Sequence, residues 1–317
     1  PYTTVLGDPK YAASRINLAQ TFNALGWIVG PLVGSLFIFR NTSTDNMLVS
    51  FGKTLKIIFT GVADNATNVV TETGKAVENS ALIIPYVSLG VVVVLVLVMF
   101  FLVKLPEITS ETEANIADNN PTSGIKTKRI PKPLIKQRHF VMAVVAQFLY
   151  VAAQTGIGSF FVNYTIETKN LGIGEMQAGF LLGLGGMVLF ATGRFLGSFL
   201  MRYVKAELLL GTFALVNTLL MFVTATRHDN LGIIALILSY LFMSIMFPSI
   251  FALGIRGLGE QTKTASSLMV MTIVGGAICP ALMGLIGEQN MNTGFIIPMI
   301  CFAYIAVFGY VQSKQIH

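Results

Sequence analysis

The sequence predicts an all-α, polytopic membrane helix bundle, and three observations support this fold class. Of the 317 residues, 54% are apolar and only 11% are charged, with a mean hydropathy of +0.71. Soluble domains carry about 25% charged residues, so this chain has too few to cover a water-facing surface. The apolar residues also gather in runs of about 20, the length that a helix needs to cross a bilayer. Runs such as residues 91–98 do not alternate as the strands of a membrane barrel would.

Eight stretches are long and apolar enough to be membrane-spanning helices. They cover residues 16–39, 81–104, 139–165, 176–202, 206–226, 231–255, 265–287 and 293–313. Two polar stretches interrupt the series, at 40–80 and 106–138. The second turns from acidic to basic along its length, and Pro121, Pro131 and Pro133 break any continuous helix there. We therefore interpret 106–138 as a linker between two helical bundles and 40–80 as an extracytoplasmic loop.

The lysine and arginine residues predict how the chain is oriented in the membrane. If the residues before the first span are cytoplasmic, the alternating spans place 14 Lys and Arg on the cytoplasmic side and six on the other. This excess follows the positive-inside rule and places both the linker and the C-terminus in the cytoplasm. The net charge of +6 therefore reflects topology and not a nucleic-acid partner, because the basic residues form no patch with stacking aromatics.

The two predicted bundles are unequal, with two spans before the linker and six after it. Many carriers consist of two repeated halves, so we expect an N-terminal truncation, with eight full spans of twelve present. The absence of an initiating Met agrees with this expectation. On this interpretation residues 1–105 hold the end of helix 4 with helices 5 and 6, and 139–317 hold the C-terminal six-helix half.

The sequence lacks the motifs of ATP-driven pumps and of common hydrolases. It has no Walker loop, no G-x-S-x-G, no H-E-x-x-H and no paired carboxylates within the predicted spans. Its two cysteines offer no zinc-ligand spacing. We therefore expect a protein that is not an enzyme and that needs no metal and no cofactor.

Polar, uncharged side chains lie together on single faces of two predicted spans. They are Asn17, Gln20 and Asn23 in the first span, and Gln147, Tyr150 and Gln154 in the third. An amide both donates and accepts hydrogen bonds, so such a face suits a neutral polyhydroxy ligand, and an aromatic ring packs against its CH groups. Two interpretations stay open: the amides line a cavity, or they only join neighbouring helices by hydrogen bonds.

Other residues concern packing and gating. Arg194, which follows Gly193, is the one charged residue well inside a predicted span. Two roles stay open for it: its side chain extends to the lipid phosphates or caps a helix end, or it holds a cytoplasmic gate closed. Pro248 interrupts the sixth span, where it marks a hinge or is simply a proline that a membrane helix tolerates. Gly275 and Gly276 make the seventh span bendable.

Five blocks of the sequence carry a resemblance to a known family. They are residues 1–7 with 15–26, 146–155, 193–197, 244–251 and 266–277. Together they resemble the fucose–galactose–glucose:proton symporter family of the major facilitator superfamily. The resemblance implies a major facilitator fold of two six-helix halves, alternating access, and proton-driven sugar uptake across a bacterial inner membrane.

The resemblance also implies roles for residues at matching positions. It implies that the residues in contact with the sugar are Gln20, Asn23, Gln147, Tyr150 and Gln154. It also implies that the acids of proton coupling precede Pro1. At 246–248 the chain reads Met-Phe-Pro, where the L-fucose carriers of the family have Gln-Tyr-Pro. Phe247 thus joins the expected sugar site, and the loss of that amide and hydroxyl favours a glucose or galactose carrier.

Taken together, these patterns predict a multi-pass, proton-coupled symporter of a monosaccharide, L-fucose or a related hexose. Its expected partners are the sugar, the proton and membrane lipid, and we expect a monomer. The alternatives are a glucose/galactose carrier of the same family, a membrane sugar sensor that does not transport, and a drug-efflux protein. The amide-rich faces count against efflux, which calls for a larger apolar cavity.

Overall fold

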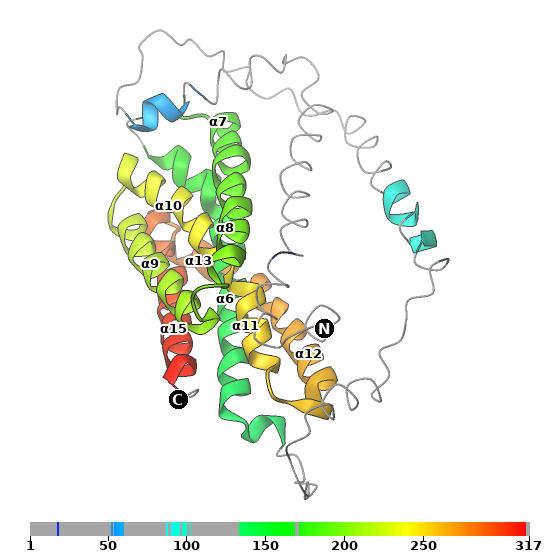
Figure 1. Cartoon of the computed structure of the whole chain (residues 1–317). Helices are drawn as coiled ribbons and strands as arrows, with labels where there is room; N and C mark the ends of the chain where they lie inside the picture. The colour runs from blue at the N-terminus through cyan, green and yellow to red at the C-terminus, as the bar shows by residue number, and fades with distance from the viewer. Residues whose placement is uncertain are drawn as a thin grey trace, which may run out of the picture.

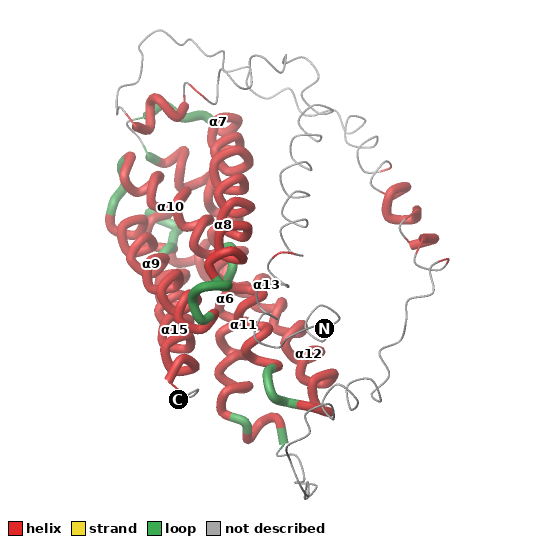
Figure 2. Tube along the Cα trace, in the orientation of Figure 1, coloured by secondary structure: helices red, strands yellow, loops and turns green. Residues whose placement is uncertain are grey.

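The structure is a computed structural model, and it describes residues 133–168 and 171–314 together with short stretches at 18, 52, 54–59, 87, 90–95, 97–99 and 102. In these residues every regular element is helical, as Figures 1 and 2 show. The all-α prediction is therefore confirmed. Gln20 and Asn23, most of the loop at 40–80 and most of the first two predicted spans lie outside the described residues.

Six helical spans are long and apolar enough to cross a membrane, by length and composition. They are Arg138–Glu167, Gln177–Leu200, Ala206–Thr226, Asn230–Ile255, Thr262–Ile286 and Met291–Lys314. Their ends fall within about three residues of the six spans predicted after the linker. Apolar runs this long form helices in a bilayer because only an internally bonded backbone avoids unpaired polar groups in lipid.

Three of these spans consist mainly of one continuous α-helix each. They are α6 (Arg138–Glu167), α9 (Ala206–Thr226) and α15 (Ile296–Lys314), the last preceded by the short α14 (Met291–Gly294). Helix α15 packs against both α9 and α6. The first of these contacts is very close, because a Cβ atom at Gly309 would lie 2.6 Å from the backbone nitrogen of Gly211.

The other three spans are interrupted. The first runs from α7 (Glu175–Phe180) through a π-helical turn into α8 (Met187–Leu200). The second consists of α10 (Asn230–Met243) and α11 (Met246–Ile255), and the third of α12 (Thr262–Met271), a 3₁₀ turn and α13 (Gly275–Ile286). Irregular backbone within a membrane span is tolerated where neighbouring protein groups satisfy it.

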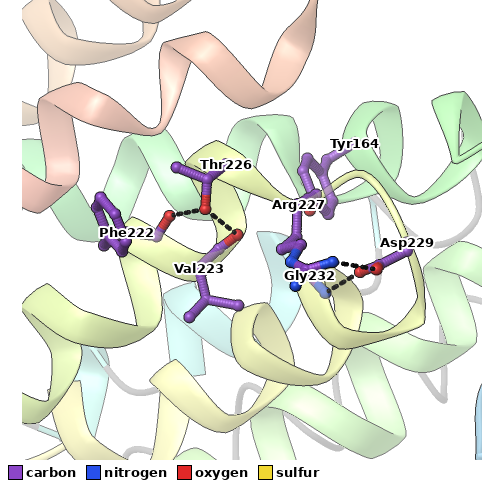
Figure 3. Close-up of polar contacts among 7 residues, drawn as sticks. All are labelled: Tyr164, Phe222, Val223, Thr226, Arg227, Asp229 and Gly232. Carbon is purple, nitrogen blue, oxygen red and sulfur yellow. Dashed lines mark hydrogen bonds and ion pairs between the residues drawn. The ribbon is translucent and has the colours of Figure 1, made fainter.

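At the Glu167 end of α6, polar groups tie three spans together (Figure 3). The Tyr164 hydroxyl lies 3.1 Å from the carbonyl oxygen of Thr224 and 2.6 Å from that of Arg227, both at the end of α9. The Asp229 side chain accepts a hydrogen bond from the backbone N–H of Gly232 and so caps the start of α10. These contacts fix the short connection between α9 and α10 against α6.

The opposite ends of the helices are joined by an ion pair. Nη1 of Arg256, at the end of α11, lies 2.5 Å from Oε1 of Glu207, in the first turn of α9. Glu207 is buried, whereas about half of the Arg256 side chain is exposed. The charge on Glu207 also suits the positive N-terminal end of its helix.

Candidate functional site

The candidate site is the region where one face of α6 meets the interruption between α10 and α11. Gln147, Tyr150 and Gln154 share that face, as their spacing predicted. Gln147 and Tyr150 are fully buried and Gln154 is half-buried. One turn before Gln147, Ala143 packs on α11, since a Cβ at Gly254 would lie 2.8 Å from the Cβ of Ala143. This face of α6 is therefore directed at α11.

The interruption itself follows from the sequence at its centre. Ser244 and Ile245 form a turn between the two helices, and Pro248 lies in the first turn of α11. Proline has no N–H, so it cannot donate to the Ser244 carbonyl as a helical residue four positions later would. The Ser244 hydroxyl instead donates to the Leu241 carbonyl at 2.6 Å, which caps the end of α10 with a side chain.

Tyr150 of α6 reaches this interruption. Its hydroxyl donates to the carbonyl oxygen of Met243, the last residue of α10, at 3.0 Å. Its ring also approaches the ring of Phe247, with 6.2 Å between the centroids and 59° between the planes. Phe247 is half-buried, so part of this aromatic pair faces open space.

Gln147 is the residue of this face that the described part of the chain leaves unsatisfied. Among the described residues, neither its amide nitrogen nor its amide oxygen has a hydrogen-bond partner. A buried amide without partners costs about 1–3 kcal/mol, so such a group normally binds water, a ligand or another segment. Gln147 thus marks a buried position where a hydrogen-bonding partner from outside the described residues is expected.

Arg194 lies within the bundle, with only 5% of its surface exposed. Its guanidinium carbon is 4.6 Å from the centroid of the Phe190 ring, one turn earlier on α8. The positive charge is therefore covered by an aromatic ring of its own helix.

Glycines let two further helices approach the site closely. A Cβ at Gly193 would overlap the Leu241 carbonyl oxygen, and it would lie 2.5 Å from the Ser244 hydroxyl oxygen. On the other side, a Cβ at Gly275 would lie 2.5 Å from the Phe148 carbonyl oxygen. Gly276 similarly faces the hydroxyl of Thr155. These glycines bring α8 to the interruption and α13 to α6.

Sequence reasoning missed two features of this region, the hydroxyl cap of Ser244 and the contact between Tyr150 and Met243. A third feature that it missed is the buried Asn217 in the middle of α9. Neither side-chain polar atom of Asn217 has a partner among the described residues. A serine four residues before a proline was a usable signal for the first feature, and a lone amide in an apolar run for the third. No sequence signal points to the Met243 carbonyl, because every residue has one.

Comparisons with known proteins identify the family. The model of the Major Facilitator Superfamily matches residues 80–280. The chain is 33% identical to the L-fucose-proton symporter of Escherichia coli K12, over 99% of this chain and 67% of that protein. This chain belongs to the major facilitator superfamily. The resemblance seen in the five sequence blocks is therefore confirmed.

Other members of the superfamily are similar over the same length. The glucose/galactose transporter of Brucella abortus is 31% identical, over 99% of this chain and 67% of its own. Two solved structures of the fucose transporter FucP match with TM-scores of 0.70 and 0.72, at 31% and 32% identity. They cover 98% of this chain, which covers 71% and 72% of theirs; the first is in the outward conformation. The chain thus spans about two thirds of the length of these relatives.

Membership of this superfamily makes the chain a multi-pass membrane transporter, and not an enzyme. Within the described residues, no group of three or more His, Cys, Asp or Glu is placed to hold a metal ion. The chemistry of the candidate site is therefore that of neutral hydrogen-bonding groups, aromatic rings and one buried guanidinium.

Proposed function

We propose that this protein is a proton-coupled symporter that carries a monosaccharide into the cell by alternating access. The observation that carries the proposal is the similarity of 31–33% along 99% of the chain to sugar carriers with two different substrates, L-fucose and glucose/galactose. The candidate site supports it, because neutral amides and aromatic rings bind an uncharged, hydroxyl-rich solute. The coupling ion is the proton, as it is for the L-fucose-proton symporters that this chain resembles.

The proposed sugar contacts lie on both halves of the carrier. In the C-terminal half they are Gln147, Gln154 and Phe247, of which Gln147 is a buried amide without a partner among the described residues and Gln154 and Phe247 are only half-buried. Tyr150 lies among them, with its hydroxyl already donated to the Met243 carbonyl. Gln20 and Asn23 face them from the N-terminal half. The N-terminal half, of which 1–105 is a part, and the C-terminal half, 139–317, rock about this site with 106–138 as the linker between them. The sugar shifts that equilibrium only through a difference in its affinity for the two states.

Phe247 directs the choice of sugar. A ring without a hydroxyl offers a surface for the CH face of a hexose and no hydrogen bond to it. A glucose or galactose substrate is therefore the second candidate beside L-fucose. Residues 106–138 and the C-terminus lie in the cytoplasm on this proposal, in a bacterial inner membrane, and the carrier is a monomer.

Transport in proteoliposomes tests this function. We expect an inward proton gradient to drive accumulation of L-fucose, D-galactose or D-glucose, and we expect a protonophore to abolish it. Sugar binding without accumulation would identify a sensor, and the absence of both for all three sugars would contradict the proposal. A periplasmic phosphatase fused to the C-terminus should stay inactive if this end is cytoplasmic.

Substitutions in the amides test the site itself. We expect Gln147→Ala to weaken sugar binding about tenfold, because it removes two hydrogen bonds of roughly 0.5–1.5 kcal/mol each. Gln20→Ala and Asn23→Ala should weaken binding as well, without a change in membrane insertion. The matched control is Asn217→Ala, which removes an equally buried amide from α9. If Gln147→Ala, Gln20→Ala and Asn23→Ala all bind the sugar as tightly as the wild-type protein does, these amides are not part of the site.

A further inference from the structure

The interruption between α10 and α11 separates two helices that pack against different neighbours. Helix α10 packs mainly against α9 and α8, whereas α11 packs mainly against α6. The two segments of this one span therefore belong to different parts of the bundle. A turn of two residues, Ser244 and Ile245, connects them, so their relative angle depends on contacts that cross the turn.

Two hydroxyl groups bind the last carbonyls of α10, but they do different things. The Ser244 hydroxyl binds the Leu241 carbonyl within its own turn, so this bond moves with α10. The Tyr150 hydroxyl binds the Met243 carbonyl from α6, a residue 93 positions away in the sequence. Since α6 is the main neighbour of α11, the Tyr150 bond fastens the end of α10 to the helix that carries α11.

Tyr150 is also enclosed by the bundle. Its side chain is fully buried. The close approach of Gly193 brings the backbone of α8 against Leu241 and Ser244 at the same turn. Helices α6 and α8 thus hold the end of α10 from two directions. The single hydroxyl proton of Tyr150 is already donated to the Met243 carbonyl.

We propose that Tyr150 is a positioning residue, which fixes the angle between α10 and α11 through the Met243 carbonyl and thereby orients Phe247 toward the sugar. Phe247 is the second residue of α11, and the centroid of its ring lies 6.2 Å from that of the Tyr150 ring. On this proposal Tyr150 acts through these two residues and does not touch the sugar. The part that concerns the sugar rests on the proposed function; the part that concerns the helices does not.

The test uses the full-length protein with Tyr150→Phe, which removes the hydroxyl and keeps the ring. Spin labels are placed on cysteines at Leu231, exposed at the start of α10, and at Lys263, exposed at the start of α12 beyond α11. The native Cys279 and Cys301 are replaced by alanine. The distance distribution between the labels is measured by electron–electron double resonance without sugar, and the sugar Kd is measured in the unlabelled variant.

We expect Tyr150→Phe to broaden the distance distribution and to raise the sugar Kd about tenfold, the effect of one lost buried hydrogen bond. The matched control is Tyr240→Phe: Tyr240 is also buried, lies on α10, and its hydroxyl has no partner among the described residues. This control should change neither quantity. Ser244→Ala should leave the distribution narrow, because its bond does not cross the turn.

Two results would overturn the proposal. An unchanged distance distribution with a raised Kd would mean that Tyr150 binds the sugar directly. An unchanged distribution with an unchanged Kd would mean that the bond to Met243 has no role in positioning. Failure of the wild-type protein to bind any sugar would overturn the proposed function instead, and the spin-label measurement would still decide whether Tyr150 fixes the two helices.

Discussion

The contact between α9 and α15 and the interruption between α10 and α11 show two opposite ways to hold helices together in a membrane. In the first, both helices are continuous and their backbones touch, with a Cβ at Gly309 calculated to lie 2.6 Å from the Gly211 nitrogen and 2.9 Å from the Glu207 carbonyl oxygen. In the second, the helix is interrupted, and the hydroxyls of Ser244 and Tyr150 donate to backbone carbonyls at the end of α10.

The difference follows from what lipid offers to a helix. Lipid tails are as apolar as leucine, so helices associate through close packing and hydrogen bonds and not through the burial of apolar surface. A backbone-to-backbone contact is tight but has no alternative geometry. A side-chain hydrogen bond that spans a turn permits an alternative geometry of the two helices, which suits the region that carries the candidate site.

The largest expected effect concerns the contact between α9 and α15. Gly309→Val places side-chain atoms against the backbone of Gly211, which cannot move aside without parting the helices. We expect a loss of about 3 kcal/mol or more in the free energy of unfolding, visible as a lower melting temperature in detergent. The control is Gly158→Val, where a Cβ meets nothing within 4 Å among the described residues. Equal melting temperatures would show that the contact is not close-packed.

The second prediction compares two neighbouring glycines on α13. A Cβ at Gly275 would lie 2.5 Å from a backbone oxygen, that of Phe148, whereas one at Gly276 would lie 2.7 Å from the side-chain hydroxyl of Thr155. Since Thr155 is exposed, its side chain can rotate away. We expect Gly275→Ala to cost about 2 kcal/mol and Gly276→Ala less than about 1 kcal/mol. The reverse order in thermal unfolding would contradict this assignment.

The third prediction concerns the ion pair that links the two regions, from the start of α9 to the end of α11. Arg256→Gln leaves the buried carboxylate of Glu207 without its cation. We expect a loss of about 1–2 kcal/mol, moderated because half of the Arg256 side chain is exposed. The double variant with Glu207→Gln should lose less than the sum of the two single losses. Additive losses in this double-mutant cycle would mean that the pair contributes no coupling.

The smallest expected change in stability comes from Pro248→Ala, which restores an N–H to the first turn of α11. This donor can pair with the Ser244 carbonyl and draw α10 and α11 into one straighter helix. We expect the free energy of unfolding to change by less than about 1 kcal/mol and sugar affinity to fall several-fold. Unchanged affinity would show that the interruption does not position the site.

Hydrophobic runs predicted the six described spans closely, as with 206–226, which is α9 to the residue. This success has a simple cause, because a bilayer demands about 20 apolar residues wherever a helix crosses. The spacing of Gln147, Tyr150 and Gln154 likewise placed them on one face. The opposite face with Gln20 and Asn23 and the linker at 106–138 stay predictions.

The sequence by itself determined that this chain is a helical membrane protein with polar groups on one face of α6, because both properties are periodic along the chain. Only the tertiary structure decided what those groups meet. Tyr150 binds a carbonyl 93 residues away, Arg256 pairs with Glu207, and Gly309 touches Gly211. Such partners depend on how the helices pack across the bundle. The sequence pattern does not show which carbonyl accepts a hydrogen bond or which two backbones approach closely.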